Sequence, residues 1–215
     1  MLNSRPKSIQ PIVLVGISLL GIASFLNTYS AEFVWDDRAA VVYNADVSDP
    51  NASWVKVWAH DFWGQNMSDH YSHKSYRPIT TLSFRFNYKG STDNPSAYHW
   101  TNIGLHGLVC ALVVVGGQVL GLSPTATVLG GLLFAVHPIH CDAVASIVGR
   151  ADVLCTAFGL VALILHQRAW YGTSFFCILL GVFYLLLFNV RCLFMLSSDV
   201  VQRIRHHFGW GARCL

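Results

Sequence analysis

Charged side chains are scarce in this sequence. Asp, Glu, Lys and Arg make up only 12% of the 215 residues, whereas 53% are hydrophobic and the mean hydropathy is +0.46. Soluble domains carry about 25% charged residues, roughly twice this share. The scarcity excludes an ordinary soluble domain and predicts a membrane protein.

Paired cysteine motifs are also missing. The six cysteines show no CxxC spacing, and several of them, such as Cys110, Cys155 and Cys177, lie inside apolar runs. This pattern indicates neither a disulfide framework nor a zinc site, so we expect small core residues. The formal net charge of +3 is modest and gives no indication of a nucleic-acid partner.

The few charges leave long stretches without any Asp, Glu, Lys or Arg. These stretches are residues 11–31, 94–141, 153–167 and 169–190. A helix needs about 20 apolar residues to cross a bilayer core, so the second stretch is long enough for two crossings. The sequence therefore predicts an all-α membrane protein with about five transmembrane helices. The expected spans are residues 11–29, 100–120, 125–136, 153–165 and 170–190, so that residues 99–190 hold helices two to five with short loops.

The first span sets the predicted orientation. Arg5 and Lys7 precede it, and the positive-inside bias therefore places residues 1–10 in the cytoplasm. A cleavable signal peptide is the alternative, but the polar residues that follow the apolar run are a poor cleavage context, so we expect a retained anchor. Residues 30–98 then form a large lumenal first loop.

Two glycosylation sequons support the lumenal placement of that loop. They begin at Asn51 and Asn66, and each has the pattern Asn-X-Ser without an intervening proline. Such asparagines are modified only on the lumenal side of the secretory pathway. The loop is also rich in aromatic residues, which we expect either to line a functional surface or to hold the loop against lipid headgroups.

The C-terminal tail conflicts with the charge bias. A fifth span would carry residues 191–215 into the lumen, yet this tail contains Arg191, Arg203, Arg205 and Arg213. Either residues 170–190 form a re-entrant or surface helix, or the tail violates the positive-inside bias.

Asp36 and Asp37 are the first candidates for chemistry. They directly follow the apolar residues 33–35 at the end of the first span, which places two carboxylates at the membrane surface. A low local dielectric raises the pKa of a carboxylate and would suit one of the pair as a general base, or the pair could bind a divalent cation. A solvated turn beside the membrane is the alternative.

A second cluster follows the third span. His137 and His140 lie three residues apart, and Asp142 follows them, a spacing that could ligate a metal on a helix. Pro138 and the absence of a second ligand cluster favour a structural role instead.

Two arginines are candidates for a phosphate contact. Arg150 is expected where a lumenal segment meets the membrane, a suitable place for a bidentate contact to a lipid phosphate. A pairing of Arg150 with Asp152 or Asp142 is the alternative. Arg77, which precedes the stiffening Pro78, could also contact phosphate or sugar, or could simply be solvated.

These motifs also occur together in one order. The blocks are residues 33–37 (FVWDD), 58–64 (WAHDFWG), 75–78 (SYRP), 98–102 (YHWTN), 137–140 (HPIH) and 148–152 (VGRAD). In this order they closely resemble the N-terminal membrane domain of the transmembrane and tetratricopeptide-repeat O-mannosyltransferases that target cadherins. The resemblance covers roughly residues 33–170, and several blocks together are far more specific than any one.

The resemblance implies a partial C-type glycosyltransferase fold in the endoplasmic reticulum membrane. Dolichyl-phosphate mannose would be the donor, and Ser or Thr hydroxyls of cadherin-type domains would be the acceptors. Asp36 and Asp37 would serve as acceptor base or orienter, and Arg150 and Arg77 would face the donor phosphate. The expected supporting residues are His137, His140 and Asp142.

The sequence also departs from that family. Members usually have Thr-Glu after the paired histidines, whereas Cys141 and Asp142 stand here. The family continues into tetratricopeptide repeats, while this sequence diverges near Asn189, so we expect a truncated form of such an enzyme, either active or inactive alone. A non-catalytic membrane interaction or regulatory protein is the alternative function. A transporter is disfavoured because no expected span carries a charge at mid-depth.

Overall fold

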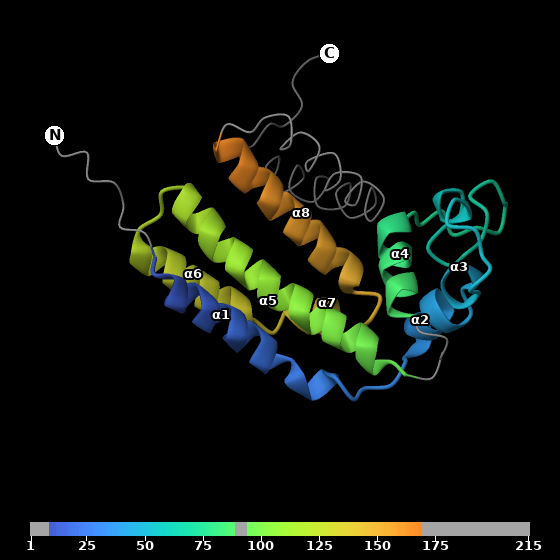
Figure 1. The fold of residues 1–215 in the computed structure, drawn as a ribbon, viewed down its shortest axis with the longest axis horizontal. Coiled ribbons are helices and arrows are strands. Elements are labelled where there is room, and N and C mark those ends of the chain that lie inside the picture. The colour runs from blue at the N-terminus through green and yellow to red at the C-terminus, as the bar shows by residue number, and fades with distance from the viewer. Residues whose placement is uncertain (1–8, 89–93, 169–215) are drawn as a thin grey trace, which may run out of the picture.

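The computed structural model describes residues 9–88 and 94–168. Regular secondary structure in these residues is helical, apart from an isolated bridge between His60 and Asn66. Four helices lie side by side, and a smaller folded unit, residues 33–88, lies beyond one end of them (Figure 1). We call this unit the cap. The all-α prediction is confirmed for the described part of the chain.

The four helices pack around a central one. They are α1 (Pro11–Ser24), α5 (Ser96–Val119), α6 (Pro124–Val136) and α8 (Arg150–Gln167). Helix α5 contacts the other three, and successive helices run in opposite directions (Figure 1). This arrangement brings both the end of α1 and the start of α8 to the cap.

Among the described residues, three segments are long and apolar enough to cross a membrane: residues 11–28, 96–119 and 150–167. They coincide with the first, second and fourth predicted spans. Helix α6 matches the third predicted span but has only 13 residues, fewer than the roughly 20 that a straight crossing requires. The fifth predicted span, residues 170–190, lies outside the described residues.

Proline and serine fix the bounds of α6. Pro124 occupies the first turn, and the Ser123 hydroxyl accepts a hydrogen bond of 3.2 Å from the Ala126 N–H. Both are favoured at a helix start. The helix ends at Val136 because the following Pro138 disfavours helical backbone at His137, which is extended with ψ 127°.

Glycines allow α1 and α5 to approach closely. A Cβ atom at Gly107 would lie 2.6 Å from Cγ1 of Ile22, and one at Gly21 would lie 2.7 Å from Sγ of Cys110. Small residues at a helix crossing let backbones pack closely where the surrounding lipid offers no hydrophobic driving force. Cys110 is fully buried there, as its predicted core role requires.

The cap is a folded unit rather than a simple loop. A cluster of buried apolar side chains, including Val41, Val47, Phe62 and Phe84, forms its core, and Tyr98 of α5 joins this cluster. The cap is therefore attached to the helices through a shared core. Its elements are α2 (Trp35–Asp37), the π-turn η2 (Arg38–Val42), α3 (Ala45–Ser48), η3 (Lys56–Trp58) and α4 (Pro78–Asn87).

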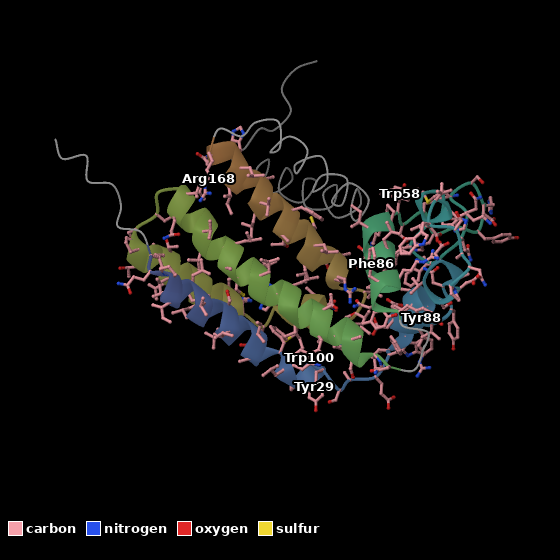
Figure 2. All side chains as sticks on the ribbon, viewed as in Figure 1. Tyr29, Trp58, Phe86, Tyr88, Trp100 and Arg168 are labelled. Carbon is pink, nitrogen blue, oxygen red and sulfur yellow. The ribbon has the colours of Figure 1, made fainter. Side chains whose placement is uncertain are left out.

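Aromatic residues mark the end of the helices nearest the cap. The rings of Tyr29, after α1, and Trp100, near the start of α5, have centroids 5.8 Å apart. Arg168 lies at the opposite end of the molecule (Figure 2). Aromatic rings and long basic side chains are enriched where helices meet the two membrane surfaces, so the arrangement suits helices that cross a bilayer.

Candidate functional site

A cavity of about 230 Å³ lies where the cap meets the start of α8. Three carboxylates and one guanidinium contribute to its wall, from Asp36, Asp142, Asp152 and Arg77. Three of these four residues were predicted site residues from separate parts of the sequence. The remaining lining residues are Phe62, Trp63, Ser146, Val148 and Gly149.

Asp36 and Asp37 occupy different environments. Asp36 is exposed and lines the cavity, whereas Asp37 is only 2% exposed. The two carboxylate oxygens of Asp37 accept hydrogen bonds from the backbone N–H groups of Val148, over 3.1 Å, and Val34, over 3.2 Å. Burial raises the pKa of Asp37 although these hydrogen bonds oppose the change. The position of Asp36 therefore suits chemistry, and that of Asp37 suits holding the cap against the segment before α8.

Arg77 is anchored at the cavity wall by its place in the chain. It directly precedes Pro78, which begins α4, and its backbone carbonyl accepts a hydrogen bond from the Thr81 N–H. The guanidinium carbon lies 4.6 Å from the centroid of the Phe62 ring, a cation–π contact that orients the side chain. A guanidinium held in this way is suited to bind an anion that enters the cavity.

Arg150 lies apart from the cavity wall and is completely buried. Its guanidinium donates to the side-chain oxygens of Asn102 (2.7 Å), Asn87 (2.6 Å) and Ser83 (3.1 Å), and to the Tyr98 carbonyl (3.0 Å). These acceptors come from α4 and α5, so Arg150 joins the start of α8 to both helices. Its role as a phosphate ligand stays a prediction.

The predicted histidines do not line the same cavity. His137 is exposed, and its Nδ1 accepts a hydrogen bond from the Ile139 N–H. His140, the first residue of α7 (His140–Ala145), packs with its ring centroid 4.3 Å from that of Phe134. Only Asp142 of this predicted group lines the cavity at the cap. The supporting role of the two histidines stays a prediction.

His140 instead lines a second cavity of about 120 Å³ among the helices. Asp152 contributes to the walls of both cavities, and His106 of α5 lines only the second.

Within residues 9–88 and 94–168, no three His, Cys, Asp or Glu side chains are grouped so that they could hold a metal ion.

Asp61 is a structural residue of the site that the sequence reasoning missed. It is 2% exposed, and one carboxylate oxygen accepts from the backbone N–H groups of Trp63 (2.9 Å) and Gln65 (3.0 Å). The other oxygen accepts from the Ser72 hydroxyl (2.6 Å) and the His73 N–H (3.1 Å). Asp61 thereby fixes the turn that places Trp63 at the cavity. The sequence pattern that could have indicated this turn is an Asp three residues before a glycine, Asp61 and Gly64.

Close backbone packing brings Asp142 and Asp152 to one wall. A Cβ atom at Gly149 would lie 2.5 Å from the carbonyl oxygen of Asp142, so only glycine allows α7 and the start of α8 to approach this closely.

Both sequon asparagines, Asn51 and Asn66, are exposed on the cap. Their glycosylation stays a prediction.

Comparison with known proteins identifies relatives of one kind. The chain is 44% identical over 151 residues to protein O-mannosyl-transferase TMTC2 of Homo sapiens, which covers 70% of this chain and 18% of that protein. It is 39% identical over 189 residues to protein O-mannosyl-transferase TMTC4 of Mus musculus, which covers 78% of this chain and 25% of that protein. The chain thus spans a quarter or less of these relatives. No protein-family model matches the chain, and no solved structure gives a significant match.

Proposed function

Because the chain is homologous to the N-terminal portion of the TMTC protein O-mannosyl-transferases, we propose that it carries the sugar-transfer site of such an enzyme. The donor is dolichyl-phosphate mannose, and the acceptors are Ser or Thr hydroxyls of cadherin-type domains. The protein resides in the endoplasmic reticulum membrane as part of a C-type glycosyltransferase fold, and its cap faces the lumen.

The cavity at the cap is the observation that carries this proposal. It combines the exposed Asp36 carboxylate with the Arg77 guanidinium in one small space beside the predicted lumenal membrane surface. Transfer from a lipid phosphate to a hydroxyl requires a group that accepts a proton and a group that stabilises the departing phosphate. Asp142 and Asp152 also line the cavity, but we assign the first role to Asp36 because the family resemblance places the acidic pair at residues 36 and 37. Arg77 supplies the guanidinium of the cavity and takes the second role.

The proposed step is a single displacement at the anomeric carbon of mannose. Asp36 accepts the proton of the acceptor hydroxyl while the oxygen of that hydroxyl forms the new bond to the anomeric carbon. The bond between the anomeric carbon and the phosphate oxygen breaks, and the electron pair leaves with the dolichyl phosphate. Arg77 stabilises the charge that develops on this phosphate. Attack from the face opposite the leaving group inverts the anomeric configuration.

A transfer assay tests the proposal directly. The purified chain in lipid nanodiscs is given radiolabelled dolichyl-phosphate mannose and a cadherin domain, and label in the domain is measured. We expect transfer by the wild-type chain, loss of transfer in Asp36→Asn, and loss of donor binding in Arg77→Met. Arg168→Met is the matched control, because Arg168 lies at the far end of the molecule (Figure 2).

The outcomes separate the two candidate functions. Donor binding without transfer by the wild-type chain would support the non-catalytic alternative, in which the chain only binds lipid-linked sugar. The sugar-transfer proposal is wrong if neither transfer nor donor binding occurs. Transfer that survives Asp36→Asn would instead exclude Asp36 as the base.

The lumenal position of the cap has a separate test. Asn51 is exposed, and we expect glycosylation there when the chain is made in microsomes, with loss of the glycan in Ser53→Ala. Digestion near Trp58 by protease added to sealed microsomes would contradict the proposed orientation, since Trp58 is an exposed cap residue.

A further inference from the structure

We propose that Trp63 is the surface on which the sugar ring of the donor stacks. This inference rests on the proposed function and names the residue that distinguishes a mannosylated lipid from its bare phosphate. Trp63 and Phe62 are the aromatic residues of the cavity wall at the cap.

The Phe62 ring is covered by the cap core and by the Arg77 guanidinium. It is 1% exposed within the cap core, and the Arg77 guanidinium carbon lies 4.6 Å from its ring centroid. Trp63 is partly exposed and packs edge-on with Phe62, with ring centroids 5.1 Å apart and an interplanar angle of 72°. The His73 ring also packs against Trp63, with centroids 6.4 Å apart and an interplanar angle of 85°. Of the two cavity aromatics, Trp63 has the larger exposed surface to offer a ligand.

The position of Trp63 is fixed before any ligand enters. Its backbone N–H donates to the buried Asp61 carboxylate over 2.9 Å. Asn44 supports the same turn, because its side-chain N–H donates to the Phe62 carbonyl over 3.1 Å. At Gly64 the backbone has a φ of +82°, and a Cβ atom there would clash with the Asn44 side chain. A backbone held by such a turn loses little conformational entropy on binding.

The composition of the wall suits one hexose ring. The face of an indole is electron-rich and attracts the weakly positive C–H groups of one face of a sugar. The carboxylates of Asp142 and Asp152 can accept hydrogen bonds from sugar hydroxyls at the same time. The volume of about 230 Å³ is smaller than the roughly 300–1,000 Å³ of sites for drug-sized ligands, so it suits the sugar rather than the lipid chain.

Two lipids that differ only in the sugar test the inference. Binding of dolichyl-phosphate mannose and of dolichyl phosphate is measured for the full chain in nanodiscs. We expect Trp63→Leu to weaken binding of the mannosylated lipid on the order of threefold to tenfold, with unchanged binding of dolichyl phosphate. Trp63→Phe should recover part of the loss. Trp58→Leu, which changes an exposed cap tryptophan outside the cavity (Figure 2), should bind both lipids as the wild type does.

The other possible binding results each contradict either the stacking inference or the proposed function. Equal binding of both lipids by Trp63→Leu and the wild type makes the stacking inference wrong and leaves the proposed function intact. Equal weakening for both lipids assigns Trp63 a purely structural role and also overturns the inference. A wild-type chain that binds neither lipid contradicts the proposed function, and the stacking role fails with it.

Trp63→Phe is used if Trp63→Leu does not fold, as judged by its melting temperature. The same two lipids are compared, and we expect a twofold loss of binding that is confined to the mannosylated lipid. Unchanged binding of the mannosylated lipid by Trp63→Phe would overturn the inference.

Discussion

The carboxylate of Asp37 accepts a hydrogen bond from the backbone N–H of Val148, 111 residues further along the chain, over 3.1 Å. This bond joins the start of the cap to the segment between α7 and α8. Both segments contribute to the cavity wall, so the bond fixes two sides of the candidate site relative to one another. It also gives adjacent aspartates separate, testable roles.

We expect Asp37→Ala and Asp36→Ala to affect different properties. Asp37→Ala leaves the N–H groups of Val34 and Val148 without their acceptor, which should cost about 1–3 kcal/mol of stability. Asp36→Ala removes an exposed side chain and should leave the melting temperature unchanged while it abolishes transfer. Thermal unfolding of both variants in one detergent checks the first effect. Equal melting temperatures for the two variants would contradict the structural role of Asp37.

The two predicted phosphate-binding arginines should also separate. Arg150→Met deprives several buried acceptors of their donors and should cost about 3 kcal/mol or more, with only partial rescue by Arg150→Lys, whose single ammonium cannot match the planar guanidinium. Arg77→Met should preserve folding and lose donor binding. Expression, melting temperature and dolichyl-phosphate binding distinguish the two. A stable Arg150→Lys variant that no longer binds dolichyl phosphate would restore Arg150 as a phosphate ligand.

The stability of the protein should fall under mild acid because of His140. Burial lowers the pKa of His140 from its ordinary 6.5, and the neighbouring His106 and His137 lower it further. The unfolded chain therefore takes up a proton at a higher pH than the folded one. The stabilising contribution is fully present above pH 6.5 and is lost as the pH falls through the lower folded pKa.

Melting temperatures measured from pH 7.5 downward check this expectation. The wild-type protein should lose stability below about pH 6.5, and His140→Leu should show a shallower dependence on pH. His70→Gln is the matched control, since His70 is an exposed cap residue, whereas His140 packs against Phe134 among the helices. Identical pH profiles for the wild type and His140→Leu would show that another group causes any acid sensitivity.

The long helices could be predicted from the sequence because they depend on local composition. Uncharged runs located α1, α5 and α8 to within a few residues, and the predicted span at residues 125–136 located α6. The start of α8 at Arg150 was missed, because a charged residue was taken to end the membrane segment. Tertiary contacts bury this charge and supply its hydrogen-bond acceptors, and composition does not reveal such contacts.

The cap and the division of roles within the site could not be predicted in this way. Asp36 and Asp37 are identical in type and adjacent, so only the fold decides which of them meets the Val148 N–H. Asp61 and Trp63 lie in a segment of polar and aromatic residues without helical periodicity, and their roles depend on a turn closed by distant partners such as Ser72. Ordered motifs indicated the candidate site residues, and long-range hydrogen bonds distinguish the roles that we propose for them.

Gly149→Ala should open the candidate site without removing any polar group from it. A Cβ atom at this position would lie 2.5 Å from the Asp142 carbonyl oxygen and 2.6 Å from that of Ala143, both rigid backbone atoms. The two segments must move apart, which we expect to cost about 1–3 kcal/mol and to shift Asp142 away from Asp152.

Gly159→Ala, within α8, provides the matched control for this change at the residue that precedes the helix. Nothing lies within 4 Å of a Cβ atom at Gly159, so alanine there should raise stability by about 0.5–1 kcal/mol through its higher helix propensity. Melting temperature and dolichyl-phosphate mannose binding of both variants are compared with those of the wild type. If the close approach of α7 and α8 shapes the cavity, Gly149→Ala loses stability and binding together while Gly159→Ala loses neither. Equal binding by Gly149→Ala and the wild type would show that the sugar does not contact the wall formed by Asp142 and Asp152.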